Sequence, residues 1–210
     1  MLRNVVLGLS VPMMLCAVAS GQDAKRGWEN APAQWHDTAD GLVETVPAGT
    51  DYWRTTHYGF IRDNGPFRHQ EAKGDFEAVV RVSGKYRERY HQAGLMIRID
   101  NENWIKTGIE YVNGKQNVSA VVTRKVSDWS VNPRNDSPPF LWLRLQRHGD
   151  AVQISSSLDG QTWTMFRMAY FPPDVPVKIG MVAAAPGKQS FEATFDHFQV
   201  GPLRDLPKEE

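Results

Sequence analysis

Apolar and polar residues alternate with a period of two in one segment after another, and this pattern constrains the fold of the chain more than any other feature. Residues 76–82, 95–99, 104–111 and 141–146 alternate in this way, and turn residues such as Ser83-Gly84 and Asp100-Asn101 end them. Successive side chains of a strand point to opposite faces, so the period predicts strands with one buried face. We therefore expect an all-β protein of about ten strands with short turns.

The turns also indicate how the strands connect. Asn113-Gly114 separates two alternating segments, and both residues tolerate the positive φ of a type I′ hairpin. Seventeen Gly and 13 Pro are spread through the chain without a Ser-, Gly- or Pro-rich linker. We predict one domain with the architecture of a β-sandwich, with a β-barrel as the alternative. Loops are expected at residues 28–35, 50–68 and 127–139.

The charge balance and the cysteine count exclude several classes of function. The chain has 24 Lys and Arg against 24 Asp and Glu, so no overall field steers it onto nucleic acid or an anionic membrane. One Cys permits no internal disulfide bond. No His or Cys spacing is typical of a zinc or iron site, and no glycine-rich phosphate loop follows a strand. We expect no metal and no cofactor.

The first residues have the pattern of a signal peptide. A basic start precedes an apolar run, and Ala17-Val18-Ala19 offers a small-x-small cleavage site. The run is short for a membrane span. Acylation of Cys16 is disfavoured, because bulky Leu15 precedes it where a lipoprotein has a small residue. We predict a signal peptide at 1–19, a lead at 20–27, the sandwich at 28–200 and a tail at 201–210, in a secreted or periplasmic protein without a membrane span after cleavage.

Five motifs occur in an order that resembles a known family. They read TDYWR at 50–54, HYGFIRDNG at 57–65, YHQAGLMIRID at 90–100, NWIKTGIE at 103–110 and SDWS at 127–130. Together they resemble an uncharacterised family of concanavalin A-like domains that includes the fungal "regulation of enolase protein". The resemblance implies a lectin/glucanase-like jelly-roll β-sandwich and brings no catalytic residue with it. Because a signal peptide is predicted, the role of intracellular fungal relatives is not expected to carry over.

The alternation also predicts a ligand surface on one sheet. In a jelly roll one sheet is concave, and polar faces of several strands would line it if their apolar faces form the core. Aromatic rings stack on sugar rings, and planar Arg or Gln groups bond to hydroxyls, so we expect a carbohydrate or glycoconjugate ligand. A solvated or internally paired face is the alternative. The candidate ligand-binding residues are Gln92, Arg98, Trp104, Lys106, Glu110, Trp142 and Arg144, with His57 and Tyr58 in a loop at the rim.

We therefore predict an exported, non-catalytic carbohydrate-binding protein, with two alternatives. A hydrolase or lyase is the first, but the Glu-x-Asp-x-x-Glu pattern of glucanases with this fold is absent. A lyase would need a base such as His57 or Tyr58 near Arg98 or Lys106. A protein-interaction module is the second, and a sheet face filled by its own side chains would favour it.

Overall fold

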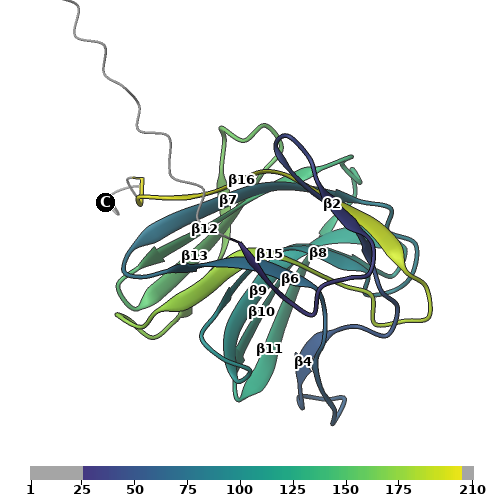
Figure 1. Ribbon diagram of the computed structural model, residues 1–210, viewed down its shortest axis with the longest axis horizontal. Helices are drawn as coiled ribbons and strands as arrows, with labels where there is room; N and C mark the ends of the chain where they lie inside the picture. The colour runs from purple at the N-terminus through teal and green to yellow at the C-terminus, as the bar shows by residue number, and fades with distance from the viewer. Residues whose placement is uncertain (1–25, 205–210) are drawn as a thin grey trace, which may run out of the picture.

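The protein is a sandwich of two seven-stranded antiparallel sheets, seen in a computed structural model that describes residues 26–204 (Figure 1). One sheet, here called the front sheet, has the order β1-β6-β15-β8-β9-β10-β11. The other, the back sheet, has the order β14-β13-β12-β7-β16-β3-β2. A two-stranded hairpin, β4–β5, stands outside both sheets. The strands within the described residues are β1 (Gly27–Glu29), β2 (Trp35–Asp37), β3 (Gly41–Val46), β4 (Tyr52–Arg54), β5 (Ile61–Asp63), β6 (Phe67–Ala72), β7 (Phe76–Gly84), β8 (Gln92–Arg98), β9 (Asn103–Val112), β10 (Lys115–Arg124), β11 (Val126–Arg134), β12 (Leu141–His148), β13 (Ala151–Ser157), β14 (Thr164–Tyr170), β15 (Val177–Ala184) and β16 (Phe191–Gly201).

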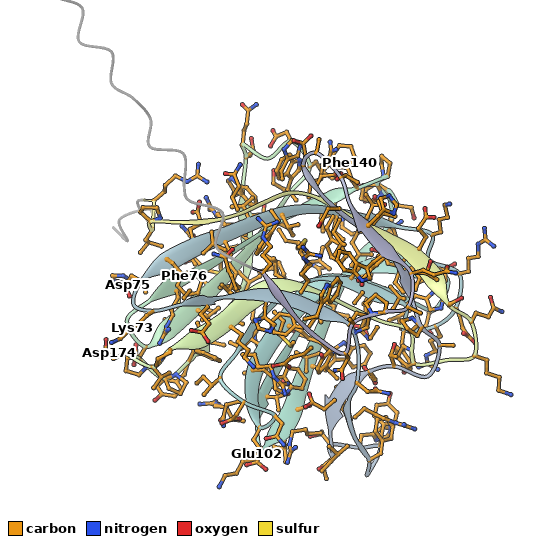
Figure 2. The ribbon with its side chains drawn as sticks, in the orientation of Figure 1. Lys73, Asp75, Phe76, Glu102, Phe140 and Asp174 are labelled. Atoms are coloured by element: carbon orange, nitrogen blue, oxygen red, sulfur yellow. The ribbon has the colours of Figure 1, made fainter. Side chains whose placement is uncertain are left out.

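The alternation places the core between the sheets, where side chains fill the space (Figure 2). Leu95 and Ile97 of β8 and Ile105 and Ile109 of β9 face the core from the front sheet. Val80 of β7 faces it from the back sheet, beside residues of β12 and β16. Burial of these apolar faces is the main favourable contribution to folding. The all-β jelly-roll sandwich predicted from the sequence is confirmed.

The hairpin predicted at Asn113-Gly114 is also present. It joins β9 to β10 with Val112 opposite Lys115, and φ is 53° at Asn113 and 76° at Gly114. Both angles are positive, as a type I′ turn requires. This turn sets the register that places Lys106 beside Val121 and Glu110 beside Asn117.

All three expected loops are in part strands. The segment 127–139 contains most of β11, the edge strand of the front sheet, which pairs with β10 over its whole length. Pro133 and the polar residues around it obscured this strand, because Pro is tolerated only where one side of a strand is free. The segment 50–68 holds the β4–β5 hairpin, and β1 and β2 overlap the ends of the segment 28–35.

Some predictions concern the two ends of the chain, residues 1–25 and 205–210, which the structure does not describe. The signal peptide predicted at 1–19, the acylation of Cys16, and residues 205–210 of the predicted tail all lie outside the described residues. Within residues 26–204, no helix is long and apolar enough to span a membrane.

Candidate functional site

The outer face of the front sheet carries most of the residues that the sequence predicted as ligand contacts. On β8, Gln92 and Arg98 alternate with core residues, and on β9 Trp104, Lys106 and Glu110 do the same. Pairing sets Gln92 opposite Glu110 and Arg98 opposite Trp104. The prediction that these five share one face is confirmed by this register.

Part of that face is covered by the chain itself. The β4 strand packs its two aromatic residues, Tyr52 and Trp53, onto the sheet, in a second apolar cluster separate from the core. Trp104 lies in this cluster, 0% exposed, with the Tyr52 ring edge-on at 6.0 Å. Trp104 therefore has no surface for a ligand and is a packing residue. The other members of the cluster are Phe67, Met96, Val121 and Val182.

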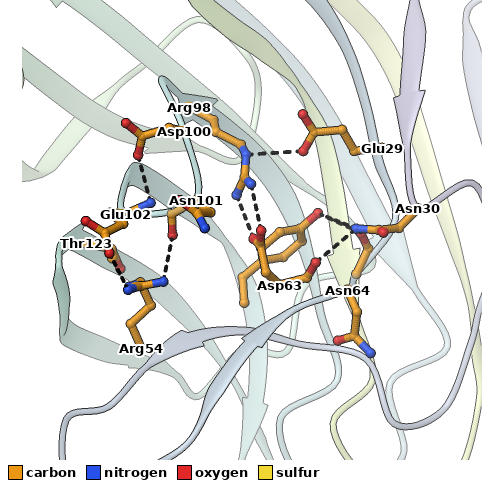
Figure 3. A network of polar contacts seen from close by, with 12 residues as sticks. Glu29, Asn30, Arg54, Asp63, Asn64, Arg98, Asp100, Asn101, Glu102 and Thr123 are labelled. Atoms are coloured by element: carbon orange, nitrogen blue, oxygen red, sulfur yellow. Dashed lines mark hydrogen bonds and ion pairs between the residues drawn. The ribbon is translucent and has the colours of Figure 1, made fainter.

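Arg98 holds this covering segment in place (Figure 3). Its guanidinium donates two parallel hydrogen bonds to the Asp63 carboxylate, at 2.6 and 2.7 Å, and its Nε lies 3.2 Å from the carboxylate of Glu29. Burial disfavours the charged guanidinium, but the bonds and charges of Asp63 and Glu29 outweigh it and raise the pKa of Arg98. Arg98 is thus a buried anchor for β5.

Lys106 makes the corresponding contact with β4. Its Nζ donates to the carbonyl oxygen of Tyr52 at 2.8 Å and to Asp51 Oδ1 at 3.3 Å. The Lys106 side chain is nearly buried, so this pairing removes the cost of an isolated internal charge. Arg98 and Lys106 therefore both bind the hairpin, and Lys106 also lines the surface beside it.

Beside the covered part, the face holds a pocket with a volume of about 230 Å³, here called the aromatic pocket. Its walls come from the β4–β5 hairpin, the loop before β8 and the edge strand β11. Its floor comes from β8, β9 and β10. The lining residues are Asp51, Trp53, Tyr58, Phe60, Tyr90, Gln92, Lys106, Glu110, Val121, Trp129 and Pro186.

Four aromatic rings form a connected wall around the aromatic pocket. Trp53 meets Tyr58 edge-on at 5.5 Å, and Tyr90 meets Trp129 edge-on at 6.1 Å. The hydroxyl groups of Tyr58 and Tyr90 are hydrogen-bonded at 2.9 Å, which joins the two pairs. Burial and the bond with Tyr58 raise the pKa of Tyr90 to about 12, so the Tyr90 hydroxyl stays protonated at neutral pH. The rings thus support one another without a ligand.

Glu110 is the main polar group of the floor. Its Oε2 accepts hydrogen bonds from Ser119 Oγ at 2.6 Å and from Trp129 Nε1 at 2.8 Å. Its other oxygen, Oε1, accepts no hydrogen bond from the described residues. Burial raises the pKa of Glu110, and Lys106, Ser119 and Trp129 offset only part of that effect. The floor of the aromatic pocket thus carries a carboxyl group, that of Glu110, with one oxygen free of hydrogen bonds from the described residues.

Four of the nine predicted ligand residues line the aromatic pocket, namely Gln92, Lys106, Glu110 and Tyr58. His57, with φ of 63°, lies outside the lining and contacts the Tyr58 ring edge-on at 4.8 Å. The expectation that Trp142 and Arg144 share this surface is wrong. Both lie on β12 in the middle of the back sheet, so they face the opposite side of the sandwich.

Two of the four aromatic rings of the wall, those of Tyr90 and Trp129, were not predicted from the sequence. Trp129 fell in an expected loop, although Ser127, Trp129 and Val131 alternate with polar neighbours as a strand would. Tyr90 is an isolated aromatic residue before β8, with φ of 70°, and no periodic signal marks it. Asp51, Trp53 and Phe60 reach the face only because the hairpin folds over it.

The chemistry available here is that of binding or of acid–base transfer. No group of three or more His, Cys, Asp or Glu residues that would hold a metal ion occurs within residues 26–204. The aromatic pocket offers ring faces for apolar surface, and a carboxyl, an ammonium and an amide group for hydroxyls.

Two comparisons connect the chain to a yeast protein. "Regulation of enolase protein 1" from Saccharomyces cerevisiae is 36% identical over 173 residues, which cover 82% of this chain and 87% of that protein. A crystal structure of a functionally unknown protein from the same organism superposes with a TM-score of 0.82 at 36% identity, over 85% of this chain and 97% of the other.

The predicted secreted or periplasmic location is wrong by this comparison. The yeast relative is named for the regulation of enolase, which points to an intracellular protein, and it matches most of the length of this chain. The prediction gave the apolar run near the N-terminus more weight than the family resemblance.

More distant similarities concern the fold alone. A GH43 protein from Bacillus licheniformis superposes with a TM-score of 0.62 at 15% identity, over 77% of this chain and 33% of that one. The carbohydrate-binding module CBM66 from Bacillus subtilis gives a TM-score of 0.55 at 16% identity, over 83% of this chain and 95% of the module. A family model matches residues 28–203, nearly the whole sandwich. With the yeast relative, this match shows that the chain belongs to the family described as "Protein of unknown function (DUF1349)".

Proposed function

We propose that this protein binds carbohydrate and takes one sugar ring into the aromatic pocket without transforming it. The observation that carries the proposal is the combination of four connected aromatic rings with the free carboxyl oxygen of Glu110 beneath them. Ring faces bury the apolar C–H surface of a sugar, and fixed polar groups select its hydroxyls.

The size of the aromatic pocket supports a small ligand. At about 230 Å³ it is below the roughly 300–1,000 Å³ of sites for drug-sized molecules. The Tyr58–Tyr90 pair and the β4–β5 hairpin bound it on one side, and Trp129 bounds it on the other. We infer that the ligand enters as one terminal sugar unit rather than lying along the sheet as a chain.

The fold is compatible with this function. Structural neighbours include the carbohydrate-binding module CBM66 and a GH43 glycoside hydrolase. Those similarities are at or below 18% identity, so they support the scaffold and leave the ligand to be argued from the aromatic pocket.

Tyr58→Ala tests the proposal with little risk to the fold, because Tyr58 is 42% exposed in a hairpin loop. We expect weaker binding by about tenfold or more, since one stacking ring is worth roughly 1.4 kcal/mol or more. Binding is first located on a glycan array and then measured by calorimetry. Tyr58→Phe keeps the ring and should bind within a few-fold of wild type. Tyr170→Ala removes an equally exposed ring from the back sheet and should change nothing.

Two results would contradict carbohydrate binding in the aromatic pocket. An array on which the wild-type protein binds no sugar would refute the proposal. So would a sugar whose affinity is the same in wild type and Tyr58→Ala.

Glycoside hydrolysis is a second candidate, favoured by one observation. Glu110 has a raised pKa and shares the aromatic pocket with Asp51, whose charge adds to that shift. A site with two carboxyl groups, one of which has a raised pKa, is the arrangement that glycosidases use. Release of reducing ends from a polysaccharide panel, abolished by Glu110→Gln, would establish it. If the array sugar binds and no reducing ends appear, the protein is a binder.

A further inference from the structure

A second hollow lies on the opposite side of the sandwich, on the outer face of the back sheet. It has a volume of about 460 Å³ and is here called the Arg144 groove. Its floor is β12 with the neighbouring strands β7 and β16, and the turn after β13 forms one side. Its lining includes Trp142, Arg144, Trp163, His197, Gln199 and Arg204.

Aromatic stacking orients the groups of this groove. The guanidinium carbon of Arg144 lies 4.5 Å from the centre of the Trp163 ring. Trp142 stacks on His197 with ring centres 5.2 Å apart and an interplanar angle of 20°. Arg144 is therefore a preorganised planar cation stacked on Trp163, and little rotamer entropy remains to be lost when it binds a ligand.

The nearest carboxylate does not satisfy Arg144. Glu77 Oε1 accepts a hydrogen bond from Arg204 Nε at 2.7 Å, and Glu77 Oε2 accepts one from Gln146 Nε2 at 2.9 Å. The Nη1 atom of Arg144 stays 4.0 Å from Glu77 Oε2, which is beyond hydrogen-bond distance. Two arginines thus lie near the Glu77 carboxylate, but only Arg204 forms a hydrogen bond with it.

Arg144 is left with donors and no acceptor among the described residues. Its Nε is buried without a hydrogen-bond partner, and neither Nη donates a hydrogen bond to another described residue. Arg81 and Asp196, which lie beside Trp142, pair with each other at 2.9 Å and cancel in charge. Glu77 and Arg204 are also paired, so among residues 26–204 the floor of the Arg144 groove carries one uncompensated positive charge.

The electrostatics agree with this geometry. Burial lowers the pKa of Arg144, and the charge of Arg204 lowers it further, while Glu77 raises it. A partly buried guanidinium with unused donors costs free energy that a bound anion would recover. A carboxylate or phosphate matches the guanidinium fork with two parallel hydrogen bonds.

We propose that the Arg144 groove is a binding site for the oxyanion group, carboxylate or phosphate, of a small acidic ligand. The anion bonds to Arg144, and the amide of Gln199 and the ring of Trp163 contact the rest of the molecule. This site is independent of the aromatic pocket, because the two lie on opposite faces of the sandwich.

Calorimetric titration with four probes tests the site in the wild-type chain. Inorganic phosphate and glucuronate carry the two oxyanions, glucose 6-phosphate adds a ring to phosphate, and glucose is the neutral control. We expect saturable binding of at least one oxyanion probe and at least tenfold weaker binding of glucose. Binding confined to glucose, or none by any probe, would overturn the proposal.

Three variants assign the binding to Arg144. Arg144→Gln should weaken it at least tenfold, and Arg144→Lys should restore part of it, because a lysine keeps the charge and loses the fork. Arg167→Gln is the matched control, since this arginine of the back sheet is already paired with Asp128 at 3.2 Å. Equal affinity in wild type and Arg144→Gln would refute the assignment.

Arg204→Gln keeps the proposal testable if Arg144→Gln does not fold. This change leaves Arg144 intact and frees Glu77, which then competes with the ligand for the guanidinium. We expect anion binding to weaken several-fold. Unchanged affinity in this variant would contradict the inference that pairing with Arg204 keeps Glu77 from competing for Arg144.

Discussion

Glu44 is the residue whose burial conflicts most directly with its charge. It lies on β3 between Leu42 and Val46, which share its core-facing side, and it is 2% exposed. Its Oε2 is buried without a hydrogen-bond partner. Burial raises the pKa of Glu44 to about 8, from the ordinary value of 4.5. The folded protein therefore holds this carboxyl as a neutral acid at neutral pH.

Stability should consequently depend on pH through Glu44. The folded-state pKa is above that of the unfolded chain, so the stabilising effect is complete below pH 4.5 and is lost as pH rises towards 8. We expect the free energy of unfolding to fall in this window by up to about 1.4 kcal/mol per pH unit from this group. Glu44→Gln should remove that slope, measured by urea unfolding at several pH values.

The exposed residue Glu71 supplies the control, since Glu71→Gln should leave the slope unchanged. A slope that is the same in wild type and Glu44→Gln would contradict the prediction.

At the scale of elements, the β4–β5 hairpin decides what the front sheet exposes. Arg98, Lys106 and the packing of Tyr52 hold it against the sheet, and it brings Trp53 and Tyr58 to the wall of the aromatic pocket. The Tyr52 hydroxyl also donates to the carbonyl of Gly65 at 2.7 Å. The hairpin is thus part of the folded unit, although it belongs to neither sheet.

Tyr52→Ala should show the worth of this attachment. Removing a fully buried aromatic ring leaves a cavity and should destabilise the protein by about 3–5 kcal/mol. Tyr52→Phe keeps the ring and loses the hydroxyl, which donates to Gly65 and accepts from Asn30, and should cost about 0.5–1.5 kcal/mol. Denaturant unfolding measures both. Equal losses in the two variants would mean that the ring does not anchor the hairpin.

The length of an element also limits how well it can be predicted from the sequence. Residues 104–111 were predicted as a strand with Lys106 and Glu110 on one face, and they are so arranged. Residues 52–54 were expected within a loop, because three residues are too few for a period of two to be recognised. That short strand covers Trp104, which the sequence placed on an open surface.

At the scale of the whole molecule, the order of strands interleaves distant parts of the chain. β7 lies between β12 and β16, and β15 lies between β6 and β8. Each sheet therefore needs strands from both halves of the sequence, and no half has a core of its own. Such a topology is expected to unfold as one cooperative unit.

We predict one urea transition, with coincident midpoints from far-UV circular dichroism and from tryptophan fluorescence. The first probe reports on both sheets, and the second reports on tryptophans in each of them, including Trp104 in the front sheet and Trp142 in the back sheet. Two separate midpoints would contradict the prediction and would indicate that the front-sheet cover unfolds first.

The sequence by itself determined the longer alternating strands, such as β7, β8, β9 and β12, and which side chains of one strand point the same way. It did so because the period of two is a local property of an extended chain. Gln92, Lys106 and Glu110 were identified on that basis as surface neighbours. Tertiary structure alone decided which sheet each strand joins, since the alternation of β9 and that of β12 look alike and only long-range pairing separates them. Arg144 consequently lies in a separate groove on the back sheet, and Tyr52 packs over Trp104. Contacts between distant segments select those positions, and the local pattern does not.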